Sequence, residues 1–492
     1  MTERSSGILM HISSLPGKYG IGDFGRGAYD FVDFLVTSHQ KYWQILPLGI
    51  TSFGDSPYQS FSAFAGNPYF IDLDEMVGKD YIKEEDLKEN NLYIDKRKVD
   101  YALLYKNKMK LLRIAYNNSK EHLQSELKKF KKGEEYWLRD FSLFMALKHK
   151  YENKSWHDWE PQYKTYDSKE VLDFEKNNLE EIDFWVFTQY FFYKQWDKLK
   201  KYANTNGIKI IGDLAIYMSE DSADLWSNPK YFKLDKDLVP ISVAGVPPDS
   251  FSENGQLWGN PIYDWKALEE DGYKWWIMRI AHSFKLYDTL RIDHFRGFES
   301  YWEVKYGAKT AIEGRWVKGP GLHLFDKIKE ELGQLDIILE DLGYITPEVI
   351  KMVEDSGFPN MKVLQFAFNP YEDSEHAPHS YDKNCVAYTS THDNQTLMAW
   401  FEDLPSDISQ YTASYLKLNY DEGLNWAMIR GAWASAANLA MTSIQDMLGL
   451  DDMARMNTPS SIDNNWTWRV LEEQLTDELA LKIKSLTRLY WR

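Results

Sequence analysis

The chain has 492 residues, of which 43% are hydrophobic and 27% are charged, and its formal net charge is -18. This composition is that of an ordinary globular protein with a large core. The strong negative charge argues against a nucleic-acid partner and against binding to an anionic membrane surface.

The cysteine content indicates the cellular location, and the aromatic content indicates a possible class of ligand. The single cysteine, Cys385, cannot form an internal disulfide, so we expect a reducing, cytoplasmic location. No secretory signal and no stretch approaching the ~18 apolar residues of a membrane span is visible, so we expect no membrane association. Aromatic residues make up 15% of the chain. They fit either a large aromatic core or sugar binding, because an aromatic ring can stack on the apolar face of a pyranose.

Short β-like runs recur along the chain, and helical patterns lie between most of them. In chain order the runs are GILMHIS (7–13), YWQILPL (42–48), IKIIGDLAIY (208–217), DTLRID (288–293), DIILED (336–341), KVLQFAF (362–368), CVAYTSTHD (385–393) and LAMTSIQD (439–446). The clearest helical patterns cover 25–39, 273–287 and 346–357; the last begins at Thr346-Pro347, a good helix start. This alternation predicts an α/β protein with a (β/α)₈ barrel.

The spacing between the second and third runs is far longer than a barrel loop needs. We therefore expect a single catalytic barrel over 1–492 that carries a mainly helical inserted subdomain at about 75–200. The charged runs in the inserted subdomain fit solvated helix faces, and a partner-binding surface is a less favoured alternative.

Carboxylates cluster where a barrel places its active site, at the C-terminal ends of the strands. Four expected strands carry them at or near these ends: Asp213, Asp293, Glu340 and Asp393. A lone strand-end carboxylate is usually structural, but four on one rim would repel one another and lose hydration. Arg291, His294 and His392 could offset that repulsion. Arg291 in particular can hold Asp293 ionised.

Paired carboxylates and abundant aromatics point to chemistry at glycosidic bonds. A retaining mechanism needs one carboxylate nucleophile and a second carboxyl that protonates the leaving oxygen. It needs no cofactor and no metal. The GIGDFG stretch (20–25) matches a dinucleotide-binding pattern only weakly, because Pro16 and Gly17 separate it from the strand and no acidic residue follows at the required distance.

Long motifs in a fixed order add a family resemblance. They include GILMHISSLPGKYGIGDFG, YWQILPLGITSFGDSPYQSFSAFAGNPYFIDL, IGDLAIYMSEDSADLW, AGVPPDSFSENGQLWGNPIYDW, LRIDHFRGFESYW, ILEDLGYITPEV, STHDNQT and RMNTPSSIDNNWTWR. With these motifs the chain closely resembles the 4-α-glucanotransferases of glycoside hydrolase family 77. The likeness runs from about residue 6 to the C-terminus and is thin across the inserted helical region.

The resemblance implies a role for each matching residue. Asp293 would be the nucleophile, Glu340 the general acid and then base, and Asp393 the stabiliser of the transition state. Residues around the sugar before the cleaved bond would be Tyr58, Asp213, Arg291, His294 and His392. The resemblance also implies loop insertions at about 225–275 and 450–468 that cover the active site. The first would lie over the acceptor side and carry Asp249, Glu253, Gln256 and Trp258, and the second would carry Asn465.

The chain departs from the family pattern at two positions, because Ser460 and Asn464 stand where glycine is common. Glycine adopts backbone angles that serine resists, so this loop could be stiffer or differently posed. The resemblance implies transfer of α-1,4-glucan segments, with maltooligosaccharides as substrates. Two alternatives remain: a hydrolytic α-amylase-like glycosidase, and a catalytically inactive glucan-binding barrel.

Overall fold

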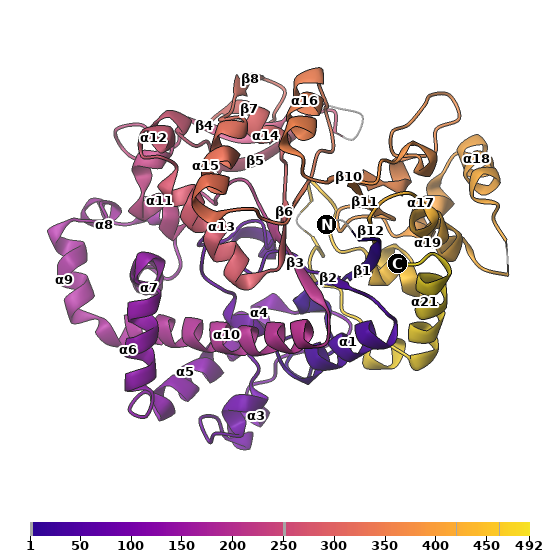
Figure 1. Cartoon of the computed structure of the whole chain (residues 1–492). Coiled ribbons are helices and arrows are strands. Elements are labelled where there is room, and N and C mark those ends of the chain that lie inside the picture. The colour runs from indigo at the N-terminus through magenta and orange to yellow at the C-terminus, as the bar shows by residue number, and fades with distance from the viewer. Residues whose placement is uncertain (1–2, 249–251, 420, 462) are drawn as a thin grey trace.

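The fold is a closed barrel of parallel strands, seen in a computed structural model that describes residues 3–248, 252–419, 421–461 and 463–492. The strand order around the barrel is β1-β12-β11-β10-β9-β6-β3-β2 (Figure 1). These strands are β1 (Ser5–Leu9), β2 (Tyr42–Gln44), β3 (Lys209–Leu214), β6 (Thr289–Ile292), β9 (Ile337–Leu339), β10 (Asn360–Val363), β11 (Cys385–Tyr388) and β12 (Leu439–Ser443). Each overlaps one of the eight expected runs, so the predicted (β/α)₈ fold is confirmed.

Several strands end earlier than their apolar runs suggest. The run at 385–393 is a strand only to Tyr388, and the next two residues, Thr389 and Ser390, donate their hydroxyls to the buried Asp446 carboxylate. The rest of that run forms a tight loop, in which the Asn394 side chain accepts a hydrogen bond from the Thr391 backbone at 2.9 Å. The functional residues of this run therefore sit on a loop above the barrel, not on a strand.

The barrel interior is filled by side chains that alternate along the strands. The apolar residues in this cluster are Tyr42, Ile211, Ile338, Met361, Val363, Val386, Tyr388, Leu439 and Met441. A second, larger core lies between the strands and the surrounding helices. The helices around the barrel include α1 (Arg26–Thr37), α13 (Lys274–Leu286), α15 (Leu322–Leu332), α16 (Pro347–Ser356), α17 (Leu397–Asp403), α18 (Ser406–Leu416), α19 (Leu424–Ala434), α20 (Ile444–Leu448) and α21 (Asp477–Leu489).

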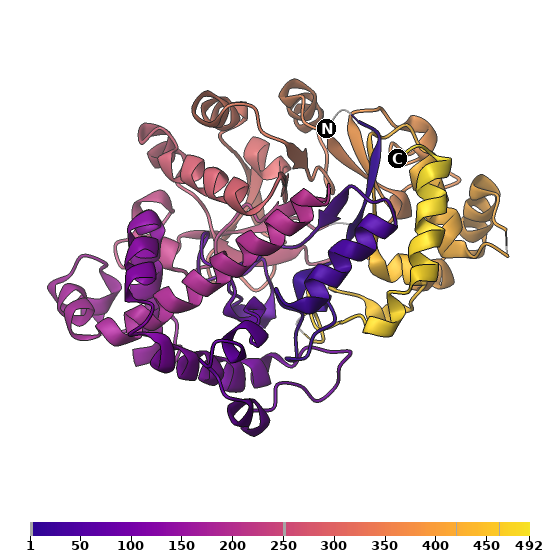
Figure 2. The same ribbon diagram turned by 60° about the horizontal axis from the view of Figure 1, so that its bottom comes forward.

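Helices fill the long segment between β2 and β3. They are α2 (Asp74–Val77), α3 (Glu84–Glu89), α4 (Tyr101–Leu103), α5 (Met109–Ser119), α6 (Gln124–Gly133), α7 (Glu135–Lys150), α8 (Pro161–Lys164), α9 (Lys169–Asn177) and α10 (Leu179–Thr205). Helix α10 runs from the inserted helices to the barrel, where it lies beside α1 (Figure 2). Its C-terminal part packs on the barrel wall, with the Trp196 indole donating to the Leu286 carbonyl at 3.0 Å.

A small antiparallel sheet stands beside the barrel in the order β5-β4-β7-β8. Its strands are β4 (Ser242–Val246), β5 (Gln256–Pro261), β7 (Ser300–Lys305) and β8 (Gly314–Lys318). The first two fall within 225–275, where only a loop insertion was expected, and the hairpin of β7 and β8 was not anticipated. Short helices α11 (Ala223–Ser227), α12 (Trp265–Glu270) and α14 (Arg296–Glu299) connect this region to the barrel.

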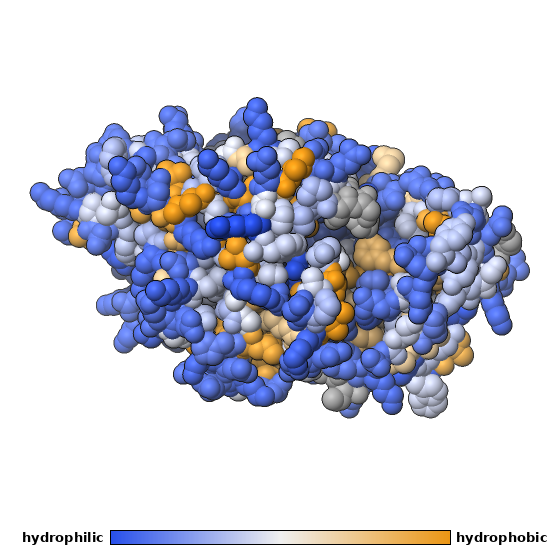
Figure 3. All heavy atoms as spheres, turned by 90° about the horizontal axis from the view of Figure 1, so that it is seen from above, coloured by the Kyte–Doolittle hydropathy of each residue, from blue (hydrophilic) through white to orange (hydrophobic). Residues whose placement is uncertain are grey.

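The molecular surface is mainly hydrophilic on the face shown in Figure 3, with small apolar patches and a hollow near the middle. Among the described residues, no helix combines the length and the apolar character needed to cross a bilayer.

Candidate active site

Strand register brings Asp213 and Arg291 together inside the barrel. They are direct partners in the parallel pairing of β3 with β6. The Arg291 Nη1 atom lies 2.7 Å from both Asp213 carboxylate oxygens, and both side chains are buried. The Tyr58 hydroxyl donates to Asp213 Oδ2 at 2.6 Å. Buried charges are tolerated when they form an ion pair with further hydrogen bonds, as these two do. The pair therefore holds both side chains in fixed positions below Asp293.

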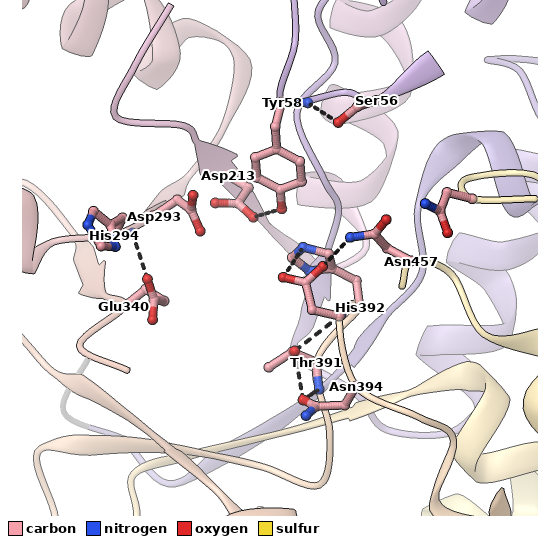
Figure 4. Close-up of polar contacts among 12 residues, drawn as sticks. Ser56, Tyr58, Asp213, Asp293, His294, Glu340, Thr391, His392, Asn394 and Asn457 are labelled. Atoms are coloured by element: carbon pink, nitrogen blue, oxygen red, sulfur yellow. Dashed lines mark hydrogen bonds and ion pairs between the residues drawn. The ribbon is translucent and has the colours of Figure 1, made fainter. Parts of the chain in front are cut away.

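Asp293 and Glu340 follow directly after the neighbouring strands β6 and β9. Their backbones continue the barrel ladder by one residue each: Asp293 N–H donates to the Leu214 carbonyl and Glu340 N–H to the Ile292 carbonyl, both at 3.0 Å. Arg291 Nη1 lies 3.0 Å from Asp293 Oδ1. This extension places the two carboxyl groups side by side, as Figure 4 shows.

Burial dominates the protonation of these two acids. It raises the pKa of Asp293 well above the usual range; Arg291 opposes this rise, whereas Asp213, Glu340 and Asp393 add to it. Burial also raises the pKa of Glu340, against the effect of Arg291. Asp213, Asp293 and Glu340 all act on the one Arg291 charge, and this arrangement favours a state in which Asp293 and Glu340 together hold one proton.

The Glu340 carboxyl is held by backbone amides. Its Oε2 accepts the His294 N–H at 2.6 Å and its Oε1 accepts the Leu342 N–H at 2.8 Å. His294 has a φ of 52°, a left-handed conformation that is uncommon for a residue other than glycine. This backbone conformation aims its N–H at Glu340. The His294 ring packs edge-on against Trp258, with ring centroids 4.7 Å apart, and burial lowers its pKa to about 3. The imidazole is thus neutral near pH 7.

Asp393 lies on the loop after β11, and 46% of its side chain is exposed. His392 Nε2 is 3.3 Å from Asp393 Oδ2. Asn457 Nδ2 donates to Asp393 Oδ1 at 2.6 Å, and Arg455 Nη2 donates to the Asp393 carbonyl at 2.8 Å. Sequence reasoning missed Asn457 and Arg455. They lie in the quoted RMNT motif, but no residue pattern links that motif to Asp393.

Aromatic rings close the opposite side of the site. Tyr58 stacks on His392 with centroids 5.2 Å apart and ring planes 15° apart, and Trp466 lies 5.8 Å from Tyr58. Burial lowers the pKa of His392, while Asp393 opposes that shift. In Figure 4, Asp293 and Glu340 lie on one side of an open space and His392 on the other. The residues that the sequence predicted to share one site are therefore brought together.

Residues expected over the acceptor side are more dispersed. Trp258 on β5 contacts both His294 and Tyr217, and its indole N–H donates to Gln256 Oε1 at 3.2 Å. Glu253 is exposed in the turn between β4 and β5. Asp249, which was expected on the same loop, lies outside the described residues.

The second covering loop is held by Asn465. Its Oδ1 accepts the Thr458 N–H at 2.9 Å, and its Nδ2 donates to the Ser461 carbonyl at 2.8 Å. Both ends of the Asn465 amide therefore make hydrogen bonds within its own loop. Ser460 and Asn464 have φ angles of 63° and 60°, so both keep the left-handed conformation that glycine would favour. At both positions where the chain departs from the family pattern, the backbone therefore has the conformation expected for glycine.

Comparisons with known proteins agree over nearly the whole chain. The sequence model of one protein family, described as 4-alpha-glucanotransferase, matches residues 10–475. The 4-alpha-glucanotransferase of Clostridium butyricum is 53% identical over 98% of this chain and 100% of its own length. That of Thermus thermophilus is 43% identical over 98% of each chain. The structure of an amylomaltase from Streptococcus agalactiae in complex with acarbose has 44% identity and a TM-score of 0.97, with 100% of both chains covered.

Proposed function

The chain belongs to the 4-α-glucanotransferase family, and from that premise we propose how its residues carry out the reaction. The enzyme transfers a segment of an α-1,4-glucan to the 4-hydroxyl of another glucan or of glucose, with retention of configuration. The observation that carries this proposal is the meeting of Asp293, Glu340 and Asp393 at one rim of a barrel whose full-length relatives are glucanotransferases.

Asp293 is the nucleophile. Its carboxylate is held by Arg291 at 3.0 Å, and 28% of its side chain is exposed toward the cleft, so an oxygen can reach a bound sugar. It attacks the anomeric carbon, the glycosidic C–O bond breaks, and the leaving oxygen takes a proton from Glu340. The product of this half-reaction is a covalent glycosyl–enzyme.

Glu340 serves first as acid and then as base. Asp293 and Glu340 share one proton, and because Arg291 lies 3.0 Å from Asp293 the shared proton is favoured on Glu340. The amides of His294 and Leu342 hold the Glu340 carboxyl in place beside Asp293. In the second half-reaction it removes the proton from an acceptor 4-hydroxyl, which attacks the anomeric carbon and releases Asp293. Asp393 makes no covalent bond; its negative charge stabilises the oxocarbenium-like transition state.

The surrounding residues bind the sugars. We assign the ring before the cleaved bond to the pocket formed by Tyr58, Asp213, Arg291, His294 and His392. The acceptor side is assigned to Trp258 and Gln256, with Glu253 and Asn465 on the covering loops. Asp249, which the resemblance assigns to the same side, lies outside the described residues. The similar amylomaltase from Streptococcus agalactiae is in complex with acarbose, which supports sugar binding by this chain.

Transfer is favoured over hydrolysis. Water and a sugar hydroxyl compete for the glycosyl–enzyme, and aromatic acceptor loops bind sugar while excluding water. The hydrolytic alternative is less supported, because the full-length relatives are glucanotransferases. We further propose that α-1,4-glucans and maltooligosaccharides are the substrates. The single cysteine and the net charge of -18 support a cytoplasmic enzyme without a nucleic-acid or membrane partner.

Incubation with maltotriose tests this function. We expect glucose together with oligosaccharides longer than maltotriose, separated by chromatography. Stepwise shortening alone would rule out transfer. The Glu340→Gln and Asp293→Asn variants should lose turnover but still bind glucan.

A matched control is Asp341→Asn, at the same strand end as Glu340. The Asp341 carboxylate accepts hydrogen bonds from the Asn360 side chain and the Met361 N–H, so it is occupied away from the cleft. This variant should retain turnover. Full turnover by Glu340→Gln would refute its assignment as the acid.

A further inference from the structure

An exposed pair of aromatic rings lies close to the general acid and has no role in the site described above. Trp316 is on β8, and Tyr344 follows Glu340 by four residues. They are 37% and 59% exposed, and their ring centroids lie 6.0 Å apart with planes 19° apart. We call this pair the outer platform. Large exposed aromatics are costly to keep in water, so near-parallel rings beside an active site point to a ligand.

The Trp316 ring is held in a defined orientation. Trp302 is its cross-strand partner on β7, and the two rings meet at 65° with centroids 5.1 Å apart. The Trp302 indole donates to the Ala311 carbonyl at 2.9 Å. A side chain at Gly314 would clash with Trp302, because an added Cβ would lie 2.4 Å from its Nε1. The hairpin is thus shaped to seat these two indoles.

A buried arginine lies against the platform. The Arg296 guanidinium is 3.8 Å from the Trp316 ring centroid and 5.8 Å from that of Tyr344. Its Nη2 donates to Ser300 Oγ at 3.1 Å, while Nε and Nη1 have no hydrogen-bond partner among the described residues. Leaving donors unpaired in a buried position is unfavourable, and the cation–π contact offsets part of that cost. The arginine therefore fixes the rings in place.

The platform continues the acceptor side of the active site. Arg296 follows the nucleophile Asp293 by three residues, and Figure 1 shows β7, β8 and α14 together next to α16. The Ala311 N–H donates to the Asn254 carbonyl at 3.0 Å, which ties the hairpin to the turn that bears Glu253. The acid that protonates the leaving oxygen faces the acceptor half of the glucan, so a chain leaving on that side would pass toward Tyr344.

We propose that Trp316 and Tyr344 form an outer binding subsite for α-1,4-glucan on the acceptor side, beyond the sugar that contacts Trp258. This inference rests on the proposed function. The apolar faces of pyranose rings would pack on the exposed aromatic surface. Glucose and maltose are too short to reach the platform, whereas a long oligosaccharide or amylose would span both Trp258 and Tyr344.

Acceptor length tests the proposal. With one fixed donor, we would measure KM and kcat for glucose and for maltoheptaose as acceptors. Tyr344→Ala and Trp316→Ala should raise KM for maltoheptaose about fivefold or more, the effect of losing one aromatic stacking contact. The same variants should leave the constants for glucose unchanged, and Tyr344→Phe should restore the wild-type KM because it keeps the ring.

The matched control is Trp491→Ala. Trp491 is 86% exposed, and its neighbour Arg492 bonds to the Ser5 carbonyl at the start of β1, at the opposite end of the barrel from the site. Thermal melting identifies any variant that fails to fold, and the more exposed Tyr344 gives a second test if Trp316→Ala does. Equal losses for both acceptors, or no loss for either, would overturn the outer subsite. Absence of transfer by the wild-type enzyme would instead overturn the proposed function.

Discussion

Removal of the Asn457 side chain should weaken catalysis by weakening control of Asp393. Asn457 donates to Asp393 Oδ1 at 2.6 Å, and among the described residues His392, at 3.3 Å, also contacts that carboxylate. A hydrogen bond to a charged group contributes ~1.5–3 kcal/mol. Because 46% of the Asp393 side chain is exposed, water replaces part of this contact, so the lower end of the range applies. Asn457→Ala should therefore lower kcat/KM by about tenfold.

The assay is initial-rate transfer from maltotriose, combined with a double-mutant cycle. If Asn457 acts through Asp393, then Asn457→Ala should add little to the loss already caused by Asp393→Asn. Asn118→Ala is a matched control, because that amide donates to the Tyr81 carbonyl within the helical insertion. A kcat/KM within twofold of wild type, or fully additive losses in the cycle, would refute the reasoning.

Four further predictions concern stability, pH and the covering loop. Asp213→Asn removes the buried partner of Arg291 and should lower the free energy of unfolding by about 3 kcal/mol in urea titrations. Burial raises the pKa of Glu340, so kcat/KM should fall as pH rises through a value above the usual ~4.3, and a basic limb at an ordinary glutamate pKa would contradict this. Burial raises the pKa of Asp224 to about 6, so protonated Asp224 stabilises the fold fully below pH ~4, and this stabilisation is lost as pH rises to about 6. Relative to Asp224→Asn, the wild type should lose up to about 3 kcal/mol in its free energy of unfolding across that window. Parallel pH curves for the two proteins would refute this prediction. Ser460→Gly should change the free energy of unfolding by less than about 1 kcal/mol and retain turnover, because the relief of left-handed strain at φ 63° is offset by the larger conformational entropy that glycine loses on folding. A loss of transfer would show that the serine side chain matters.

The sequence by itself determined the barrel and the positions of its principal acids. Alternation of apolar runs with helical patterns is a local property, because strands and helices bury residues at different periods. Parallel strands in a closed barrel end on one rim, so strand-end carboxylates such as Asp293 and Glu340 could be expected to meet without coordinates. The family resemblance then implied their roles.

Only the tertiary structure decided which groups control these acids. The contact between Asn457 and Asp393 joins residues 64 positions apart on two irregular loops, and no periodicity predicts how such loops pack. The left-handed backbone of His294, which aims its N–H at Glu340, is likewise imposed by the surrounding fold. The pairing of Trp302 with Trp316 required the register of the β7–β8 hairpin, and register depends on partners distant in sequence. Local sequence patterns determine the helices and strands. The charge balance of the active site and the position of the outer platform depend on contacts between residues that are far apart in the sequence.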